Sequence, residues 1–161
     1  MMGRLTRSAF IALVLSITLA GTTLAFFWRS ATLGSTSYMT TQVIAAETAR
    51  CGDAAAPNTQ LIWLARFRVM DLAYRNYFSH TAPDRTSIFN YLTAAKIAWS
   101  SAAEVLAWNS YPDDVSEATA WRQLRNSAGH WAIITNCSWT RFGAASFRVG
   151  ARHVYAIVFD R

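Results

Sequence analysis

The sequence predicts an α+β domain in which a β-sheet lies between layers of helices. Residues 59–126 contain several stretches with the apolar periodicity of helices, whereas residues 142–159 change to the pattern of a β-hairpin. Helices first and a hairpin last are typical of a layered α+β domain. The chain has 161 residues, which is the size of one domain with some residues to spare.

The first 28 residues have the layout of a secretory signal. Arg4 and Arg7 precede an apolar run that extends from Ala9 to Trp28. A run of roughly 20 apolar residues can also cross a bilayer as a helix. The run contains the tripeptide Thr-Leu-Ala twice, and neither copy is a good cleavage site. We therefore expect an extracytoplasmic protein, either secreted or anchored to the membrane by residues 1–28.

Residues 29–58 are predicted to form a linker before a domain that occupies residues 59–161. The segment is rich in Ser, Thr, Ala and Gly, and it has few large apolar residues. A short helix is expected inside it, around Thr41–Arg50. Asn58 then has the side chain of a helix N-cap at the start of the domain.

Two helices are predicted in the first half of this domain. The pattern from Thr59 to about Tyr77 is apolar on nearly every side, which is typical of a helix covered by its neighbours. A shorter helix is expected at Ile88–Ala95, with Phe89 and Leu92 pointing inward.

The segment 100–109 carries a carboxylate, Glu104, among small and apolar neighbours. A glutamate in this setting is either on the surface or buried with a partner. The next helix is expected to begin with Ser116 as its N-cap and to end near Asn126. Glu117 lies on that helix, in register with apolar residues one and two turns later.

The C-terminal hairpin is predicted from two apolar strands around Gly150-Ala151. The first strand covers residues 142–149 and the second covers residues 152–159. The second strand is almost continuously apolar, as expected of a strand that is covered on both faces.

The charge of the chain does not favour a nucleic-acid partner. Without residues 1–30 the chain has 12 Lys or Arg and 9 Asp or Glu, so its net charge is 12 − 9 = +3. The arginines are scattered and form no run, whereas nucleic-acid binding normally needs a concentrated basic face.

Cys51 and Cys137 are the two cysteines of the chain, and both follow the export segment. In an oxidising compartment such a pair favours a disulfide, with two unpaired thiols as the alternative. The bond would stabilise the fold by about 4 kcal/mol through loop closure in the unfolded chain.

Two short stretches form the chemically suggestive part of the sequence. Residues 76–80 read Asn-Tyr-Phe-Ser-His and residues 126–130 read Asn-Ser-Ala-Gly-His, so each places a histidine just past the end of a predicted helix. Glu104 and Glu117 lie between them. Two neutral imidazoles with a carboxylate and water would make an open zinc site, and a nearby glutamate could act as general base on that water. The alternative is a polar cleft in which His and Glu pair by hydrogen bonds.

The sequence lacks the common motifs of hydrolases and nucleotide-binding proteins. It contains no Gly-x-Ser-x-Gly, no phosphate loop and no His-Glu-x-x-His.

Taken in order, these stretches resemble the CAP superfamily, which groups cysteine-rich secretory proteins, antigen 5 and pathogenesis-related 1 proteins. The resemblance is to its compact bacterial secreted branch and covers about residues 59–160. Residues 76–80 resemble the first-helix signature, residues 103–109 lie where the family has Gly-Glu-Asn-Ile-Ala, and residues 126–130 resemble its Asn-Ser-Pro-Gly-His. The sequence departs from the pattern at three positions, which are Arg85, Val105 and Ala128.

The resemblance implies an α-β-α sandwich with a central cleft that holds two histidines and two glutamates. By position these would be His80, Glu104, Glu117 and His130. It also implies that a divalent cation, zinc or a similar ion, lies between the two histidines.

Three functions remain open at this stage. The first is a secreted or envelope-anchored binding module for a small ligand, lipid or envelope component, with a divalent cation in the His/Glu cleft. The second is a metal-assisted, protease-like hydrolase in which Glu104 or Glu117 is the general base. The third is a lipid- or sterol-binding protein, as some CAP relatives are.

Overall fold

The computed structural model describes residues 31–34 and 36–161. The signal or anchor predicted for residues 1–28 lies outside these residues. Among the residues described, no helix combines the length and the apolar character needed to cross a membrane.

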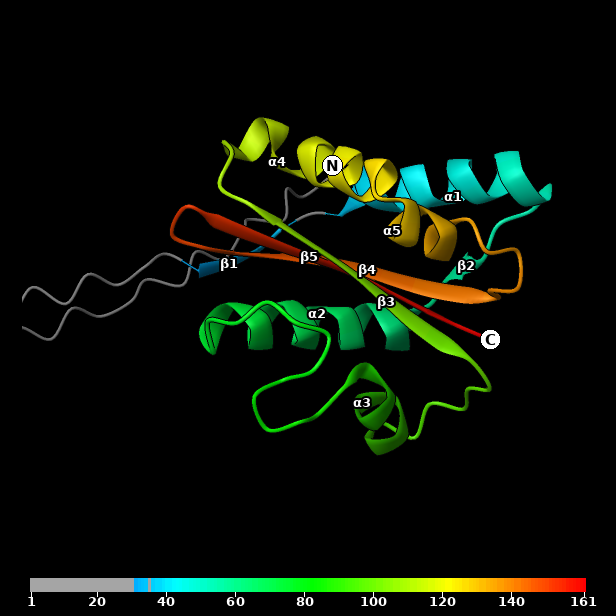
Figure 1. The fold of residues 1–161 in the computed structure, drawn as a ribbon, viewed down its shortest axis with the longest axis horizontal. Helices are drawn as coiled ribbons and strands as arrows, with labels where there is room; N and C mark the ends of the chain where they lie inside the picture. Colours follow the sequence, from blue (N-terminus) through cyan, green and yellow to red (C-terminus); the bar gives the residue numbers. More distant parts are fainter. Residues whose placement is uncertain (1–30, 35) are drawn as a thin grey trace, which may run out of the picture.

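The fold is an α-β-α sandwich, as predicted (Figure 1). The sheet has the strand order β1-β4-β5-β3, and β2 pairs in parallel with the start of β4. The strands are β1 (Ala31–Gly34), β2 (Ala56–Pro57), β3 (Ala102–Asn109), β4 (Arg141–Val149) and β5 (Arg152–Asp160). The helices are α1 (Ser37–Cys51), α2 (Thr59–Tyr74), α3 (Ile88–Ala94), α4 (Asp113–Asn126) and α5 (Ala128–Ile134).

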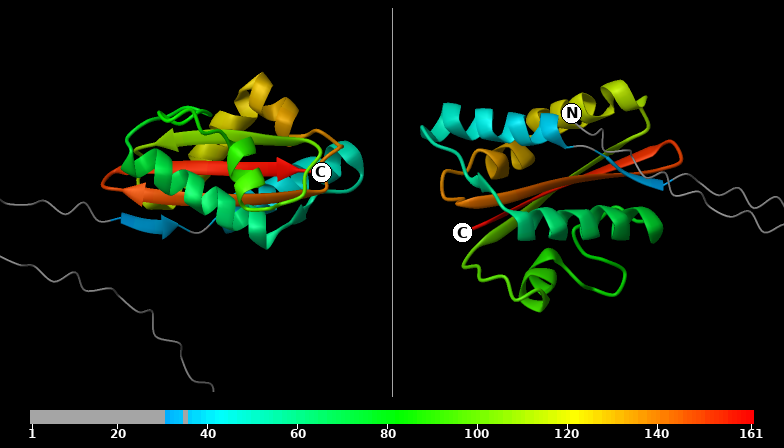
Figure 2. Two further views of the ribbon diagram at one scale, coloured as in Figure 1. Left: turned by 90° about the horizontal axis from the view of Figure 1, so that it is seen from below. Right: turned by 180° about the vertical axis from the view of Figure 1, so that it is seen from behind.

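The helices form two layers, one on each face of the sheet (Figures 1 and 2). Helices α2 and α3 cover one face, and α1, α4 and α5 cover the other. Successive residues of a strand point to opposite faces, so Val105 packs in one core and Leu106 packs in the other. Each hydrophobic core therefore lies between one face of the sheet and the helices that cover that face.

The predicted hairpin is confirmed. Strands β4 and β5 pair antiparallel over their whole length, from Arg141 opposite Asp160 to Val149 opposite Arg152. Strand β5 lies between β4 and β3 in the sheet and is buried from His153 to Asp160. This position explains why its sequence is nearly continuously apolar.

The N-cap predicted for α2 is confirmed, because the Asn58 side chain accepts a hydrogen bond from the backbone N–H of Leu61 at 3.1 Å. The prediction for α3 is half right. Leu92 is fully buried, but Phe89 is 45% exposed and packs beside Trp99 on the surface.

The start predicted for α4 is wrong, because the helix begins at Asp113 and not after Ser116. The Ser116 hydroxyl is buried and lies 2.6 Å from Asn109 Oδ1 and 2.7 Å from the Tyr155 hydroxyl. It thus belongs to a buried polar network between α4 and the sheet. The carboxylates of the first turn, Asp113 and Asp114, lie where the helix dipole favours negative charge.

The linker predicted for residues 29–58 is also corrected over the described residues. Strand β1 pairs with β4, and α1 is a helix of 15 residues that packs on the α4/α5 side of the domain. Met39 and Val43 of α1 are fully buried in the core. The composition suggested a linker because the segment has few large apolar residues. Those few are nevertheless enough to pack a helix of small residues against the core.

Gly143 of β4 lies directly against the backbone at the start of α2. A Cβ atom on Gly143 would be 2.2 Å from Ile62 N and 2.2 Å from the carbonyl carbon of Leu61. Backbone atoms cannot move aside as a flexible side chain can. Gly143→Ala is therefore expected to destabilise the fold by about 2–3 kcal/mol, as overpacked cores do.

Urea denaturation of purified Gly143→Ala and wild-type protein measures this difference. Gly129 offers a matched control, because nothing lies within 4 Å of a Cβ built there. An unfolding midpoint for Gly143→Ala equal to that of Gly129→Ala would contradict the close approach of α2 and β4.

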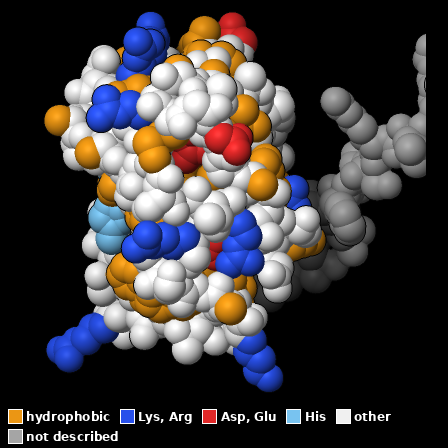
Figure 3. Space-filling model, turned by 90° about the vertical axis from the view of Figure 1, so that its right-hand side faces the viewer, with side chains coloured by type: hydrophobic (Ala, Val, Ile, Leu, Met, Phe, Trp, Pro, Cys, Tyr) orange, Lys and Arg blue, Asp and Glu red, His pale blue; other side chains and the backbone are white. Residues whose placement is uncertain are grey.

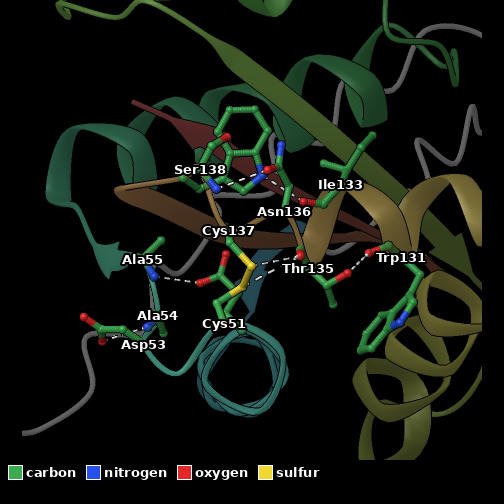
Figure 4. Close-up of a disulfide and its surroundings, with 12 residues drawn as sticks. Cys51, Asp53, Ala54, Ala55, Trp131, Ile133, Thr135, Asn136, Cys137 and Ser138 are labelled. Atoms are coloured by element: carbon green, nitrogen blue, oxygen red, sulfur yellow. Dashed lines mark hydrogen bonds between the residues drawn. A yellow bond between two sulfur atoms is a disulfide. The ribbon is translucent and has the colours of Figure 1, made fainter.

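The predicted disulfide is confirmed. It joins Cys51, the last residue of α1, to Cys137 in the loop after α5, with a Cα–Cα distance of 5.4 Å (Figure 4). One helical turn before Cys51, the buried carboxylate of Glu47 accepts a hydrogen bond from the Ala55 backbone N–H at 2.7 Å. Together these contacts fix the end of α1 and the chain that leads into β2.

Candidate functional site

A buried arginine connects the segments that form the site. Arg68 lies on the sheet-facing side of α2 and is fully buried. Its Nε donates to Glu104 Oε1 at 2.7 Å, and its two terminal nitrogens donate to the Tyr77 hydroxyl and to the Ser79 carbonyl. Arg68 thereby ties α2, the loop after α2 and strand β3 together.

Glu104 links this buried arginine to the surface. Its side chain is 2% exposed, and its second oxygen, Oε2, lies 2.9 Å from Nδ1 of His80. The His80 side chain is 59% exposed. Because the Glu104 carboxylate accepts this hydrogen bond, Nδ1 of His80 carries a proton, and in the neutral imidazole Nε2 is the nitrogen with a lone pair.

The charges of this network support one another. Burial disfavours the charged form of Arg68, but Glu104 and Tyr77 outweigh it and raise the pKa of the guanidinium. Burial and a hydrogen bond to Asp71 raise the pKa of Tyr77 to about 12. Tyr77 is therefore neutral at physiological pH and donates its proton to Asp71.

His130 approaches the site from the other layer of helices. It lies in the first turn of α5, a second helix that begins at Ala128, directly after α4. Burial, and then the charge of His80, lower the pKa of His130 below its ordinary value. Its imidazole is thus kept neutral at physiological pH, which is the form that binds a metal.

Glu117 does not join the other three predicted residues. Its Oε1 accepts a hydrogen bond from the Met39 backbone N–H at 2.8 Å, in the first turn of α1. Burial raises the pKa of its carboxyl. Within residues 31–34 and 36–161, no group of three or more His, Cys, Asp or Glu side chains could hold a metal ion. The structure therefore brings together His80 and Glu104, places His130 within electrostatic reach of His80, and uses Glu117 to cap α1.

Arg68 and Tyr77 are the residues of this network that the sequence analysis did not single out. Arg68 does leave a signal in the sequence, because it lies on the same helical face as Leu61, Leu64 and Leu72. An arginine on an apolar face needs a buried carboxylate as partner. Glu104, among small and apolar neighbours, fits that requirement.

Two surface hollows of the described residues lie away from this site. One of about 660 Å³ lies between α1 and α5 and is lined by Trp121, Trp131 and Arg125 among others. Another of about 490 Å³ lies between α2 and α3 and is lined by Trp63 and Phe67 among others. Neither is lined by His80, Glu104 or His130.

No protein-family model and no curated protein matches the sequence. Among solved structures, the chain is similar to an outer surface protein of Borrelia burgdorferi, with a TM-score of 0.68 and 13% identity over 82% of this chain and 98% of that one. It is similar to an extracellular protein of Bacillus anthracis that contains an SCP domain, with a TM-score of 0.61 and 23% identity over 75% of this chain and 39% of that one. A cysteine-rich secretory protein of Staphylococcus aureus gives a TM-score of 0.54 and 14% identity over 75% of this chain and 38% of that one.

These similarities show that the chain has the bacterial CAP-like fold that its sequence resembles. The chain spans nearly all of the Borrelia protein but less than half of the other two. Activities or partners of those longer proteins therefore do not transfer with the fold.

Proposed function

We propose that this CAP-like protein works outside the cytoplasm as a binding module, and that His80 and His130 hold a divalent cation there. The observation that carries the cation proposal is the hydrogen bond from His80 to the buried Glu104. A carboxylate on one ring nitrogen orients a histidine and makes its other nitrogen a better metal ligand.

Three observations support the location. The sequence begins with a signal or anchor pattern. Cys51 and Cys137 form a disulfide, a bond that persists in oxidising compartments. The similar structures are described as extracellular, secretory or outer-surface proteins.

The residues fit a cation held by two imidazoles and do not fit a closed cage of four protein ligands. His80 offers its free Nε2, and His130 is kept neutral. Glu104 is not available as a direct ligand, since Arg68 and His80 occupy its two oxygens. A borderline ion such as Zn²⁺ suits two imidazoles and keeps its other positions for water or a ligand.

The same contacts argue against Glu104 as a general base. A base must be free to take a proton from the attacking water, and it works best with a pKa near the working pH. Each carboxylate oxygen of Glu104 already accepts a hydrogen bond, Oε1 from Arg68 at 2.7 Å and Oε2 from His80 at 2.9 Å, so neither is free to take a proton from a water. Glu104 instead positions His80.

Titration calorimetry with Zn²⁺ tests the cation site. We expect wild-type protein to bind one Zn²⁺, and the double variant His80→Ala/His130→Ala to bind at least about tenfold more weakly, because both imidazole ligands are lost. His153→Gln is the matched control, because that histidine faces Asp113 at 3.2 Å on another part of the sheet. Equal heats in the wild type and in the double variant would rule out the site.

Zinc binding is also expected to weaken as the pH falls. Protons compete with the metal for the lone pair of His130, so binding is lost as this imidazole becomes charged. Because the pKa of His130 is lowered, its protonation is complete only at a pH below that of an ordinary histidine. The loss of binding through His130 is therefore expected in acidic solution.

A further inference from the structure

Helix α2 exposes a line of aromatic side chains on the side that faces away from the sheet. Trp63 is 62% exposed, Phe67 is 51% exposed and Tyr74 is 62% exposed. They follow one another at spacings of four and seven residues, which places them on one face of the helix. Trp63, Phe67 and Tyr74 are called the aromatic face below.

The aromatic face continues into the hollow between α2 and α3. This hollow has a volume of about 490 Å³ and is lined by Trp63 and Phe67 together with Tyr91 and Ile97. The rings of Phe67 and Tyr91 meet edge to face at 5.1 Å. The apolar surface therefore spans both helices of this layer, and contiguous exposed apolar surface of this kind marks sites of contact with a partner or a membrane.

The segment that carries this apolar surface has a net positive charge. Residues 59–99 contain five Arg or Lys and two Asp, so their net charge is 5 − 2 = +3, which equals the net charge of residues 31–161. Both aspartates pair with Arg75. Arg68 is buried and pairs with Glu104, which lies outside this range. The remaining cations are Arg66, Arg85 and Lys96, and the guanidinium of Arg66 lies 5.0 Å from the centre of the Trp63 ring.

The surface view shows how charged side chains are distributed over one face. Figure 3 shows Lys and Arg side chains projecting at the end of the molecule formed by α2 and α3, and others across the middle and at the opposite end. On the face shown, the acidic side chains lie farther from that end.

The apolar N-terminal segment joins the domain at one end of the aromatic face. Strand β1 begins at Ala31, just after the apolar run of residues 9–28, and its Leu33 pairs with Phe147 of β4. The ring of Phe147 lies 5.3 Å from the ring of Tyr74. A chain that enters a membrane through residues 9–28 would thus hold Tyr74 close to the lipid surface.

We propose that the aromatic face docks on the surface of a bilayer that contains anionic lipids. Trp and Tyr side chains favour the level of the lipid headgroups, and nearby Lys and Arg bind their phosphates. A second copy of the chain fits this surface less well, because the same net positive charge would face itself across a two-fold interface.

Vesicle co-sedimentation tests the docking with a chain that begins at residue 29 and so lacks the apolar segment. Residues 31–161 contain the sheet with both faces covered, both hydrophobic cores and the disulfide, which makes this part a self-contained folding unit. We expect binding to vesicles of phosphatidylcholine with phosphatidylglycerol, and at least about tenfold weaker binding to phosphatidylcholine alone.

The variant Trp63→Ser/Phe67→Ser is expected to lose roughly tenfold or more of this binding, and Lys96→Glu is expected to weaken it on the anionic vesicles only. Phe78→Ser/Trp108→Ser is the matched control, because these two aromatics are also exposed but lie outside the aromatic face. Circular dichroism confirms that each variant is folded.

Equal sedimentation of the wild type and the aromatic-face variant would overturn the proposal. So would an ultracentrifugation result in which the wild type is a dimer without lipid and the variant is a monomer, since a second copy would then cover the surface. Neither outcome depends on zinc, so failure here is distinct from failure of the cation site.

Discussion

Arg68→Ala is expected to destabilise the domain by about 3–5 kcal/mol. The guanidinium is fully buried, and its loss leaves Glu104 charged in the interior with His80 as the remaining partner described. It also leaves the Ser79 carbonyl and the Tyr77 hydroxyl without their donor. Guanidinium chloride unfolding, followed by tryptophan fluorescence, measures the change.

Two comparison variants separate the buried charge from the lost side-chain volume. Arg66→Ala removes an arginine from the outer side of the same helix and should change stability by no more than about 0.5 kcal/mol. Arg68→Met/Glu104→Leu removes both charges and should be clearly more stable than Arg68→Ala, because no unpaired charge stays buried. If the double variant is as unstable as Arg68→Ala, the main contribution of Arg68 is packing or its contacts to the loop, and the ion pair contributes little.

The layers of the fold could be predicted because they follow from local patterns. The change from helical to strand period at the C-terminus gave the hairpin its correct position. Asn58 marked a helix start because its side chain accepts from a backbone N–H only three residues away. Such signals need no knowledge of distant parts of the chain.

The errors arose where a distant contact decides the structure. Ser116 has the side chain of an N-cap, but Asn109 and Tyr155 hold its hydroxyl in the core. Residues 31–51 look like a linker because pairing with β4 and a few buried side chains hold them, and neither leaves a strong local pattern. Sequence spacing cannot show either of these contacts.

The candidate site was predicted only in part, because it too depends on contacts between distant residues. His80, in the loop after α2, meets Glu104 of β3, and the family resemblance supplied that pairing of the two stretches. Glu117 has the right residue type at a plausible spacing, yet its carboxylate accepts a hydrogen bond from a backbone N–H in the first turn of α1. The helix that needs this cap was assigned to a linker, so the competing role could not be recognised.

Replacing both cysteines, in Cys51→Ser/Cys137→Ser, is expected to destabilise the protein by about 4 kcal/mol. The disulfide joins residues 86 positions apart, so its loss releases a long loop in the unfolded chain. The unfolding midpoint in urea, measured for the variant and for the wild type without reductant, gives the size of the effect. Wild type in the presence of a dithiol reductant should approach the variant, and equal midpoints in all three cases would contradict the prediction.

The loss should also be uneven across the fold, which hydrogen exchange of the native protein can detect. Helix α1 buries three of its 15 residues, Met39, Val43 and Glu47, whereas α2 buries seven of 16. The disulfide holds the end of α1 to the loop after α5. Because α1 buries so few of its residues, it has few other contacts to keep it in place. In the double-serine variant we expect α1 to lose protection before α2. Because the Met39 N–H binds Glu117, opening of α1 would also free that carboxylate. Equal loss of protection in both helices would mean that the disulfide acts on the unfolded chain alone.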